Sequence, residues 1–115
     1  MRTMGELEAV VMQVLWSAEN PKTVREVLGE IDRHPPLAYT TVLTVMDNLR
    51  RKGFLTRERV GRAHAYRPAK AQADYTADLM DELLADSGDR SATLLRFVDR
   101  MTPSEVSRLR EALDD

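Results

Sequence analysis

Between Leu37 and Arg67 the chain reads LAYTTVLTVMDNLRRKGFLTRERVGRAHAYR, and the spacing of its apolar residues changes partway along. From about Ala38 to Lys52 these residues recur every three or four positions, which predicts an amphipathic helix. Its apolar side would carry Ala38, Tyr39, Val42, Leu43, Val45, Met46, Leu49 and Gly53. Its polar side would carry Thr40, Thr44, Asp47, Asn48 and Arg51, flanked by Thr41 and Lys52. A helix with donors and acceptors on its outer side is the kind of element that enters the major groove of DNA.

The residues that follow this helix predict a short basic β-hairpin. Gly53 suits the C-terminal cap of the helix, because glycine adopts the left-handed conformation that ends helices. From Leu55 to Val60 the side chains alternate in a strand pattern. Gly61-Arg62 then predicts a turn, and residues 63–67 predict the partner strand.

Two helices are predicted before this segment. The first runs from Met4 to about Ser17, with capping-box spacing at Thr3-Met4-Gly5-Glu6. The second opens with another capping box at residues 23–26 and stops before Pro35, which cannot continue a helix. A very short strand is expected at Leu37. Three helices followed by a hairpin is the order of a winged helix-turn-helix.

Three further amphipathic helices are predicted after Pro68, at residues 71–86, 89–101 and from Pro103 to the end. Short helices of this kind are marginal alone, and these are too few and too narrow for a second core. A second copy of the chain is therefore the expected partner, in contact with Leu79, Leu83, Leu94, Leu95, Val98, Leu109 and Leu113. The predicted fold class is mostly α with a small β-wing, comprising a winged-helix DNA-binding domain at 1–69 and a helical dimerisation region at 70–115.

The net charge of −2 conceals a strong asymmetry along the chain. Residues 37–70 hold eight basic and two acidic side chains, a net charge of +6, whereas residues 71–115 hold five basic and eleven acidic ones. A charged, solvated surface is the simpler interpretation of such a cluster. Here the cluster coincides with the hydroxyl-rich helix, which favours a polyanion-binding surface instead.

Composition excludes several other classes of function. The chain has no cysteine, so disulfides and thiolate metal sites are excluded. It has no apolar run near the ~20 residues that span a bilayer and no signal-like apolar core, so a cytoplasmic protein is expected. His64 would need metal-ligating partners that the sequence lacks, and the acidic residues at 74–82 suit a solvated helix face. No nucleophile–base pair or phosphate loop is present, so we expect no enzyme, no cofactor and no metal.

With these elements in place, the chain resembles the BlaI/MecI-type penicillinase repressors over nearly its whole length. The matching segments are LEAVVMQVLW at 7–16, TVREV at 23–27, AYTTVLTVMDNLRRKG at 38–53 and RAHAY at 62–66. The resemblance implies a homodimeric repressor that binds a palindromic operator and dimerises through its C-terminal helices. It also implies control of genes for β-lactam or cell-wall stress, and release by an upstream signal such as a sensor protease.

The resemblance also implies which side chains face DNA. By matching position these are Thr40, Thr41, Thr44, Asn48, Arg51 and Lys52 of the helix, with Arg57, Arg59 and Arg62 of the wing. His64 is expected beside a phosphate or packed against the wing. Arg51 and Lys52 also suit the C-terminal end of a helix. Tyr39 and Tyr66 are expected at the edge of the core rather than on DNA.

Two departures from the family pattern concern release from DNA. The best-studied members are cleaved at an Asn-Phe bond in a C-terminal helix, and the matching bond here is Arg96-Phe97. The copper-responsive relatives carry cysteine pairs, which this chain lacks. Release by a small molecule or a partner is the alternative to cleavage. A second hypothesis for the whole chain is a winged helix that binds proteins, with an acidic tail that mimics nucleic acid.

Overall fold

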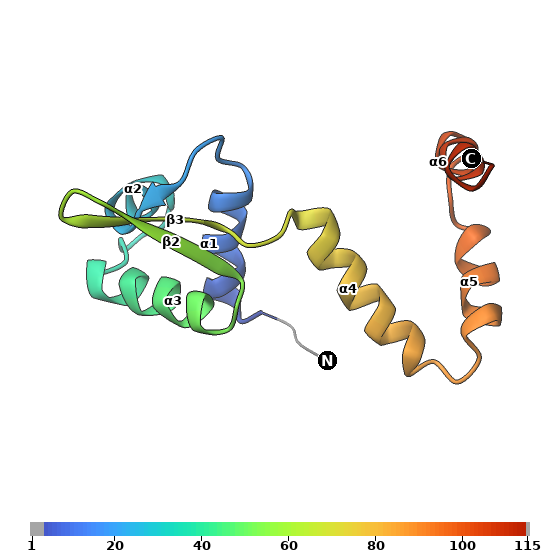
Figure 1. Cartoon of the computed structure of the whole chain (residues 1–115). Coiled ribbons are helices and arrows are strands. Elements are labelled where there is room, and N and C mark those ends of the chain that lie inside the picture. Colours follow the sequence, from blue (N-terminus) through green and yellow to red (C-terminus); the bar gives the residue numbers. More distant parts are fainter. Residues whose placement is uncertain (1–3, 115) are drawn as a thin grey trace. The chain divides into compact units, whose positions relative to one another are not determined.

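The computed structural model describes residues 4–114, and it contains a winged helix followed by three more helices (Figure 1). The elements in chain order are α1 (Glu6–Trp16), β1 (Lys22–Thr23), α2 (Val24–Glu30), α3 (Tyr39–Arg51), β2 (Leu55–Val60), β3 (Ala63–Pro68), α4 (Gln72–Ala85), α5 (Arg90–Val98) and α6 (Pro103–Leu113). This order confirms the predicted fold class. Contacts divide the chain into two compact units, and the division falls within α4, after Thr76.

Reciprocal hydrogen bonds at the start of α2 confirm the capping box predicted at residues 23–26, and α6 begins with a capping box of the same kind. At α2 the Thr23 hydroxyl accepts the Glu26 N–H at 3.2 Å, and the Glu26 carboxylate accepts the Thr23 N–H at 2.9 Å. At α6 the Thr102 hydroxyl and the Glu105 carboxylate do the same, at 3.2 and 2.9 Å. Each pair satisfies N–H groups that the first helical turn leaves without partners.

Helix α1 begins later than the sequence suggested. Gly5 occupies the N-cap position, and the Glu8 carboxylate accepts the Gly5 N–H at 3.0 Å. The predicted cap residue Thr3 lies outside the described residues. The predicted start at Met4 is therefore wrong, because the helix begins at Glu6, directly after the cap at Gly5.

A glycine cap ends α3 and directs the chain into the hairpin. Gly53 has a φ of +87°, and its N–H donates to the Arg50 carbonyl at 3.0 Å. The next N–H, of Phe54, donates to the Leu49 carbonyl at 2.9 Å. These two bonds satisfy carbonyls at the end of the helix and confirm the predicted cap.

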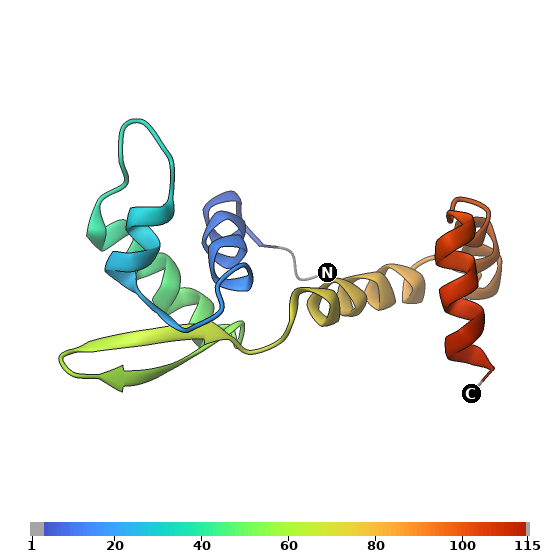
Figure 2. The same cartoon turned by 90° about the horizontal axis from the view of Figure 1, so that it is seen from above.

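The three strands form an antiparallel sheet in the order β1-β3-β2. Figure 2 shows β2 and β3 side by side as a hairpin. Residues Arg57 and Arg59 of β2 lie opposite Tyr66 and His64 of β3, and Gly61 takes the turn between them with a φ of +65°. The predicted short strand at Leu37 is wrong. The strand that joins the hairpin is β1, at Lys22–Thr23, and it pairs with β3. Two residues are too short for an alternation pattern to reveal them.

The hydrophobic core lies where the first three helices meet the sheet. Its buried residues are Val11, Met12, Leu15, Val24, Val27, Val42, Met46, Leu49, Leu55, Ala65 and Tyr66. Tyr66 is 1% exposed, which places it in the core rather than on DNA. Tyr39 and Leu43, predicted on the inward side of α3, are instead 43% and 38% exposed. The prediction was wrong for them because these two side chains border a surface hollow, whereas Val42 of the same turns is buried in the core.

The first turn of α4 packs on the winged helix through aromatic side chains. The Tyr75 ring lies 5.5 Å from the Trp16 ring and 5.4 Å, edge to face, from the Phe54 ring. The Trp16 indole N–H also donates to the Lys70 carbonyl at 3.0 Å. Such ring pairs are worth about 0.5–1.5 kcal/mol beyond the area they bury. The winged-helix unit therefore includes the start of α4.

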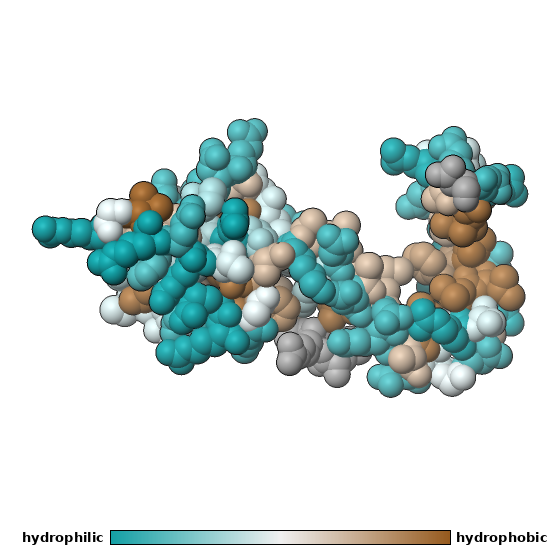
Figure 3. All heavy atoms as spheres, viewed as in Figure 1, coloured by the Kyte–Doolittle hydropathy of each residue, from teal (hydrophilic) through white to brown (hydrophobic). Residues whose placement is uncertain are grey.

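The remaining C-terminal helices expose their apolar side chains. No described residue of α4, α5 or α6 is buried, and Figure 3 shows apolar side chains gathered on α5. Leu79 is half-buried, while the other six residues predicted at the dimer interface are exposed. Leu95 and Leu113 are the most exposed of them, at 68% and 74%. These faces lack the cover that apolar surface normally receives in a folded protein.

Candidate nucleic-acid interface

Helix α3 presents one buried and one exposed side. Val42, Met46 and Leu49 are each 0% exposed and hold the helix on the core. The polar residues predicted to face DNA are all exposed, namely Thr40, Thr41, Thr44, Asn48, Arg51 and Lys52. Thr is a mediocre helix former, so three exposed Thr residues on one side have no evident role in stability.

The Asp47 carboxylate forms ion pairs with arginines from both α3 and β2. Its carboxylate lies 2.9 Å from the Arg50 guanidinium, 2.9 Å from that of Arg51 and 3.9 Å from that of Arg57. The hydrogen bond from Arg50, followed by the charges of the arginines, lowers the pKa of Asp47. The sequence predicted Asp47 on the outer polar side of the helix. Arginines three and four residues after an aspartate are the sequence pattern that indicates such ion pairs.

We expect Asp47→Asn to strengthen binding to DNA of any sequence by about threefold and to steepen its salt dependence. The reason is that the substitution removes a negative charge that lies within 4 Å of three guanidinium groups, which leaves more of their positive charge for phosphates. Titration of a scrambled duplex at several salt concentrations checks this. Glu58→Gln is the matched control, because it also removes one carboxylate. Strand alternation places Glu58 on the face of β2 opposite to Arg57 and Arg59. Weaker binding by Asp47→Asn would show that Asp47 chiefly orients the arginines.

The three predicted wing arginines differ in their surroundings. Arg57 folds back onto the domain, because its guanidinium donates to the Tyr66 hydroxyl at 3.2 Å and lies 5.9 Å from the ring centre. Arg59 donates to the Gly61 carbonyl at 3.3 Å, next to the turn. Arg62 is exposed and forms no ion pair with any described residue. The two arginines near the turn are therefore more accessible to a phosphate than Arg57.

Lys52 connects the end of α3 to the start of α1. Its ammonium lies 2.8 Å from the Glu8 carboxylate, and the side chain of Glu8 is only 16% exposed. The hydrogen bond from Lys52, and then the N–H of Gly5, lower the pKa of Glu8. Lys52 thus has a structural partner, and its contact with DNA stays a prediction.

His64 lies on β3 among positive charges. Partial desolvation, and then the charges of Arg57, Arg59 and Arg50, lower the pKa of His64 below its usual value. The lowered pKa favours the neutral form of the imidazole in the free protein. A negative group beside it would reverse this preference.

A hollow of about 290 Å³ separates the wing from the first turns of α2 and α3. Arg25 of α2 borders it, with its guanidinium carbon 5.5 Å from the centre of the Tyr39 ring. Arg62 and His64 border it from the hairpin. The sequence analysis did not identify Arg25 as a candidate binding residue. The signal that could have found it is its position in the first turn of the capped helix α2.

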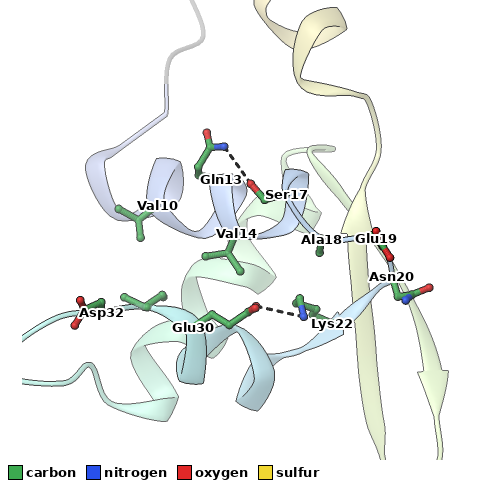
Figure 4. A pocket seen from close by; sticks show the side chains of 11 residues that line it. Val10, Gln13, Val14, Ser17, Ala18, Glu19, Asn20, Lys22, Glu30 and Asp32 are labelled. Atoms are coloured by element: carbon green, nitrogen blue, oxygen red, sulfur yellow. Dashed lines mark hydrogen bonds and ion pairs between the residues drawn. The ribbon is translucent and has the colours of Figure 1, made fainter.

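A second hollow, of about 870 Å³, runs between α1 and α2 and has different chemistry (Figure 4). Val10 and Val14 line it, and the Lys22 ammonium meets the Glu30 carboxylate at 3.3 Å. Glu19 and Asp32 add further negative charge to its rim. A groove with three carboxylates and one ammonium repels a phosphate backbone, so the polyanion surface is that of α3 and the wing.

The described residues contain no group of three histidine, cysteine, aspartate or glutamate side chains placed to hold a metal ion. None of the helices in the described part of the chain is both long enough and apolar enough to cross a bilayer.

Comparison with known proteins agrees with this geometry. The model of the penicillinase repressor family matches residues 4–115. The transcriptional regulator BlaI of Mycobacterium tuberculosis is 42% identical over 96% of this chain and 82% of its own length. The penicillinase repressor of Bacillus licheniformis is 25% identical over 97% of this chain and 90% of its own length. The solution structure of the DNA-binding domain of the repressor BlaI superposes with a TM-score of 0.54 at 27% identity, covering 65% of this chain and 94% of that domain.

Proposed function

Since the chain belongs to the penicillinase repressor family and is a DNA-binding transcriptional repressor, we propose that it binds a palindromic operator as a homodimer. In this proposal α3 enters the major groove and the wing lies along the phosphate backbone. The observation that carries it is the position of the exposed hydroxyl side of α3 within a segment of net charge +6. That combination supplies both base readout and electrostatic attraction.

The proposed DNA contacts fall into two groups, which are hydrogen-bonding side chains and cationic side chains. Thr40, Thr41, Thr44 and Asn48 are exposed hydrogen-bonding groups of α3 and serve as base or nearby phosphate contacts. The cationic groups serve the backbone, and they are Arg51, Lys52, Arg57, Arg59 and Arg62, with His64 beside them. Arg51, Lys52 and Arg57 each have a polar partner within the protein, so each must share or exchange that partner to bind a phosphate.

Residues 70–115 serve as the dimerisation region in this proposal, and residues 1–69 as the DNA-binding domain. The support is the set of exposed apolar side chains on α4–α6, from Leu83 to Leu113. Two identical subunits related by a two-fold axis match a palindrome, because each reads one half-site. Leu79 and Val98 belong to the same proposed interface.

Sequencing the DNA fragments that the purified full-length protein retains from its own genome tests the proposed function. The expected result is a shared palindrome whose half-sites are centred about one helical turn apart, or a multiple of it. We expect these fragments to lie upstream of genes for β-lactam or cell-wall stress. Retained fragments without any common motif would contradict operator recognition.

Release is proposed to follow cleavage at Arg96-Phe97 by an upstream sensor protease. This bond lies within α5, and Phe97 is 50% exposed, so a protease needs only local opening of the helix to reach it. Cleavage would separate α6 from the rest of the chain and weaken the link between half-sites. We expect mass spectrometry to find the cut chain when the source cells meet a cell-wall antibiotic. Derepressed target genes with an intact chain would contradict cleavage and indicate a ligand or partner.

A further inference from the structure

We propose that the hollow between α2, α3 and the wing holds one phosphate of the DNA backbone, with Arg25, Arg62 and His64 as its ligands. The inference rests on the proposed function, because it assumes that α3 and the wing face DNA. It adds a residue from α2 to that surface and gives Tyr39 a positioning role.

The geometry of Arg25 supports this role. Its guanidinium lies over the Tyr39 ring, 5.5 Å from the ring centre, and both side chains are exposed. A cation–π contact of this kind restrains a long side chain without neutralising its charge. Among the described residues, Arg25 has no carboxylate within ion-pair distance, so its charge is available to an anion.

The opposite side of the hollow supplies two more donors from the hairpin. Arg62 follows the turn glycine, and His64 lies in β3, opposite Arg59. Among residues 4–114, no acidic side chain lines this hollow, in contrast to the groove between α1 and α2. Three nitrogen donors and no carboxylate form a site for an oxyanion.

The position of the hollow identifies the oxyanion as a backbone phosphate. Tyr39 and Leu43 line it from the first turns of α3, directly beside the exposed Thr40 and Thr44. A helix whose first turns enter the major groove places the flanking phosphates next to those turns. The wing closes the other side, so a phosphate there would be held between two elements that face DNA.

Titrations with full-length Arg25→Gln test the proposal. We expect affinity to fall about three- to tenfold, equally for an operator and a scrambled duplex, with a salt slope smaller by about one per bound chain. Lys22→Gln is the matched control, because it removes the same charge from the groove between α1 and α2. Equal behaviour of the two variants would overturn the proposal.

A double-mutant cycle separates positioning from folding. Tyr39→Leu removes the ring beneath Arg25, so it should weaken DNA binding less than Arg25→Gln does. In the double variant, Tyr39→Leu should cause little further loss of affinity beyond that of Arg25→Gln alone. Thermal unfolding of each variant shows whether it stays folded, and Arg25→Lys tests whether charge alone restores binding. Fully additive losses in folded variants would contradict the stacked arrangement.

The dependence of affinity on pH gives an independent readout. His64 is surrounded by Arg25, Tyr39, Arg50, Arg57, Arg59 and Arg62. A bound phosphate favours the imidazolium form, so the pKa of His64 is higher in the complex and protons are taken up on binding. Affinity should therefore rise as pH falls from 8 to 6, and His64→Gln should abolish this rise. A pH-independent wild type would overturn the assignment of His64.

Failure of this proposal is distinguishable from failure of the proposed function. If the wild type shows no salt-dependent binding to DNA, the proposed function fails. If it binds DNA and Thr44→Ala weakens operator binding while Arg25→Gln matches Lys22→Gln, only the phosphate site in the hollow fails.

Discussion

Leu109→Asp is expected to convert the dimer into monomers and to lower operator affinity by a factor of about 10² or more. Leu109 is 41% exposed on α6 in the single chain, and a carboxylate there would be buried by the partner. Without the dimer, each half-site is bound separately. Sedimentation velocity measures the oligomeric state, and duplex titration measures the affinity.

The control for this substitution lies on the same helix. Ser104 is on the opposite side of α6 from Val106, Leu109 and Leu113, because helical residues repeat every 3.6 positions. Ser104→Asp adds the same charge near the helix start, where it is favourable. A dimeric Leu109→Asp variant would show that the interface lies elsewhere.

A truncated chain should end at Thr76 rather than Lys70. The shorter chain would lose the ring contacts of Tyr75 with Trp16 and Phe54, and its instability would be confused with loss of the dimer. The chain ending at Thr76 should be a folded monomer that binds operator weakly. If it remains a dimer, α5 and α6 are not required for dimerisation.

Thr44→Ala and Arg51→Ala are expected to weaken binding in different ways. If Thr44 contacts a base edge, its loss costs on the order of 1 kcal/mol or more, and only for operators with the preferred base at that position. Arg51 is 70% exposed beside Asp47, so its loss should weaken all sequences alike and lower the salt slope by about one. Titrations against operator and scrambled duplexes at several salt concentrations distinguish the two.

Thr56→Ala provides the control for Thr44→Ala. Thr56 is exposed on β2, but strand alternation places it on the opposite face from Arg57 and Arg59. We expect unchanged operator affinity in this variant. Unchanged affinity in both Thr44→Ala and Arg51→Ala would refute the assignment of α3 as the recognition helix.

Local sequence signals predicted much of the fold. The capping pair Thr23 and Glu26, the glycine cap at Gly53 and the turn at Gly61 each depend on residues close in sequence, and the structure confirms them. The winged-helix order followed because these signals mark element boundaries. Tyr39 and Leu43 were misplaced because a helical period gives the direction of a side chain but not where the neighbouring elements end.

The candidate site was only partly predictable. Residue type and helical face identified Thr40 and Thr44, which need no tertiary partner to be recognised. The pairing of Lys52 with Glu8, and the hollow that joins Arg25 to His64, depend on contacts between residues far apart in the chain. The periodicity of a sequence does not reveal which distant residues come into contact.

Backbone amide chemical shifts, followed while a duplex from the retained genomic fragments is added to the full-length protein, test the central claim most directly. We predict that the largest changes fall on the exposed side of α3, from Thr40 to Asn48, and on the wing around Arg59 and Arg62. Changes confined to the α1–α2 groove or to the C-terminal helices would contradict the claim. They would instead favour a winged helix that uses these surfaces to bind another macromolecule.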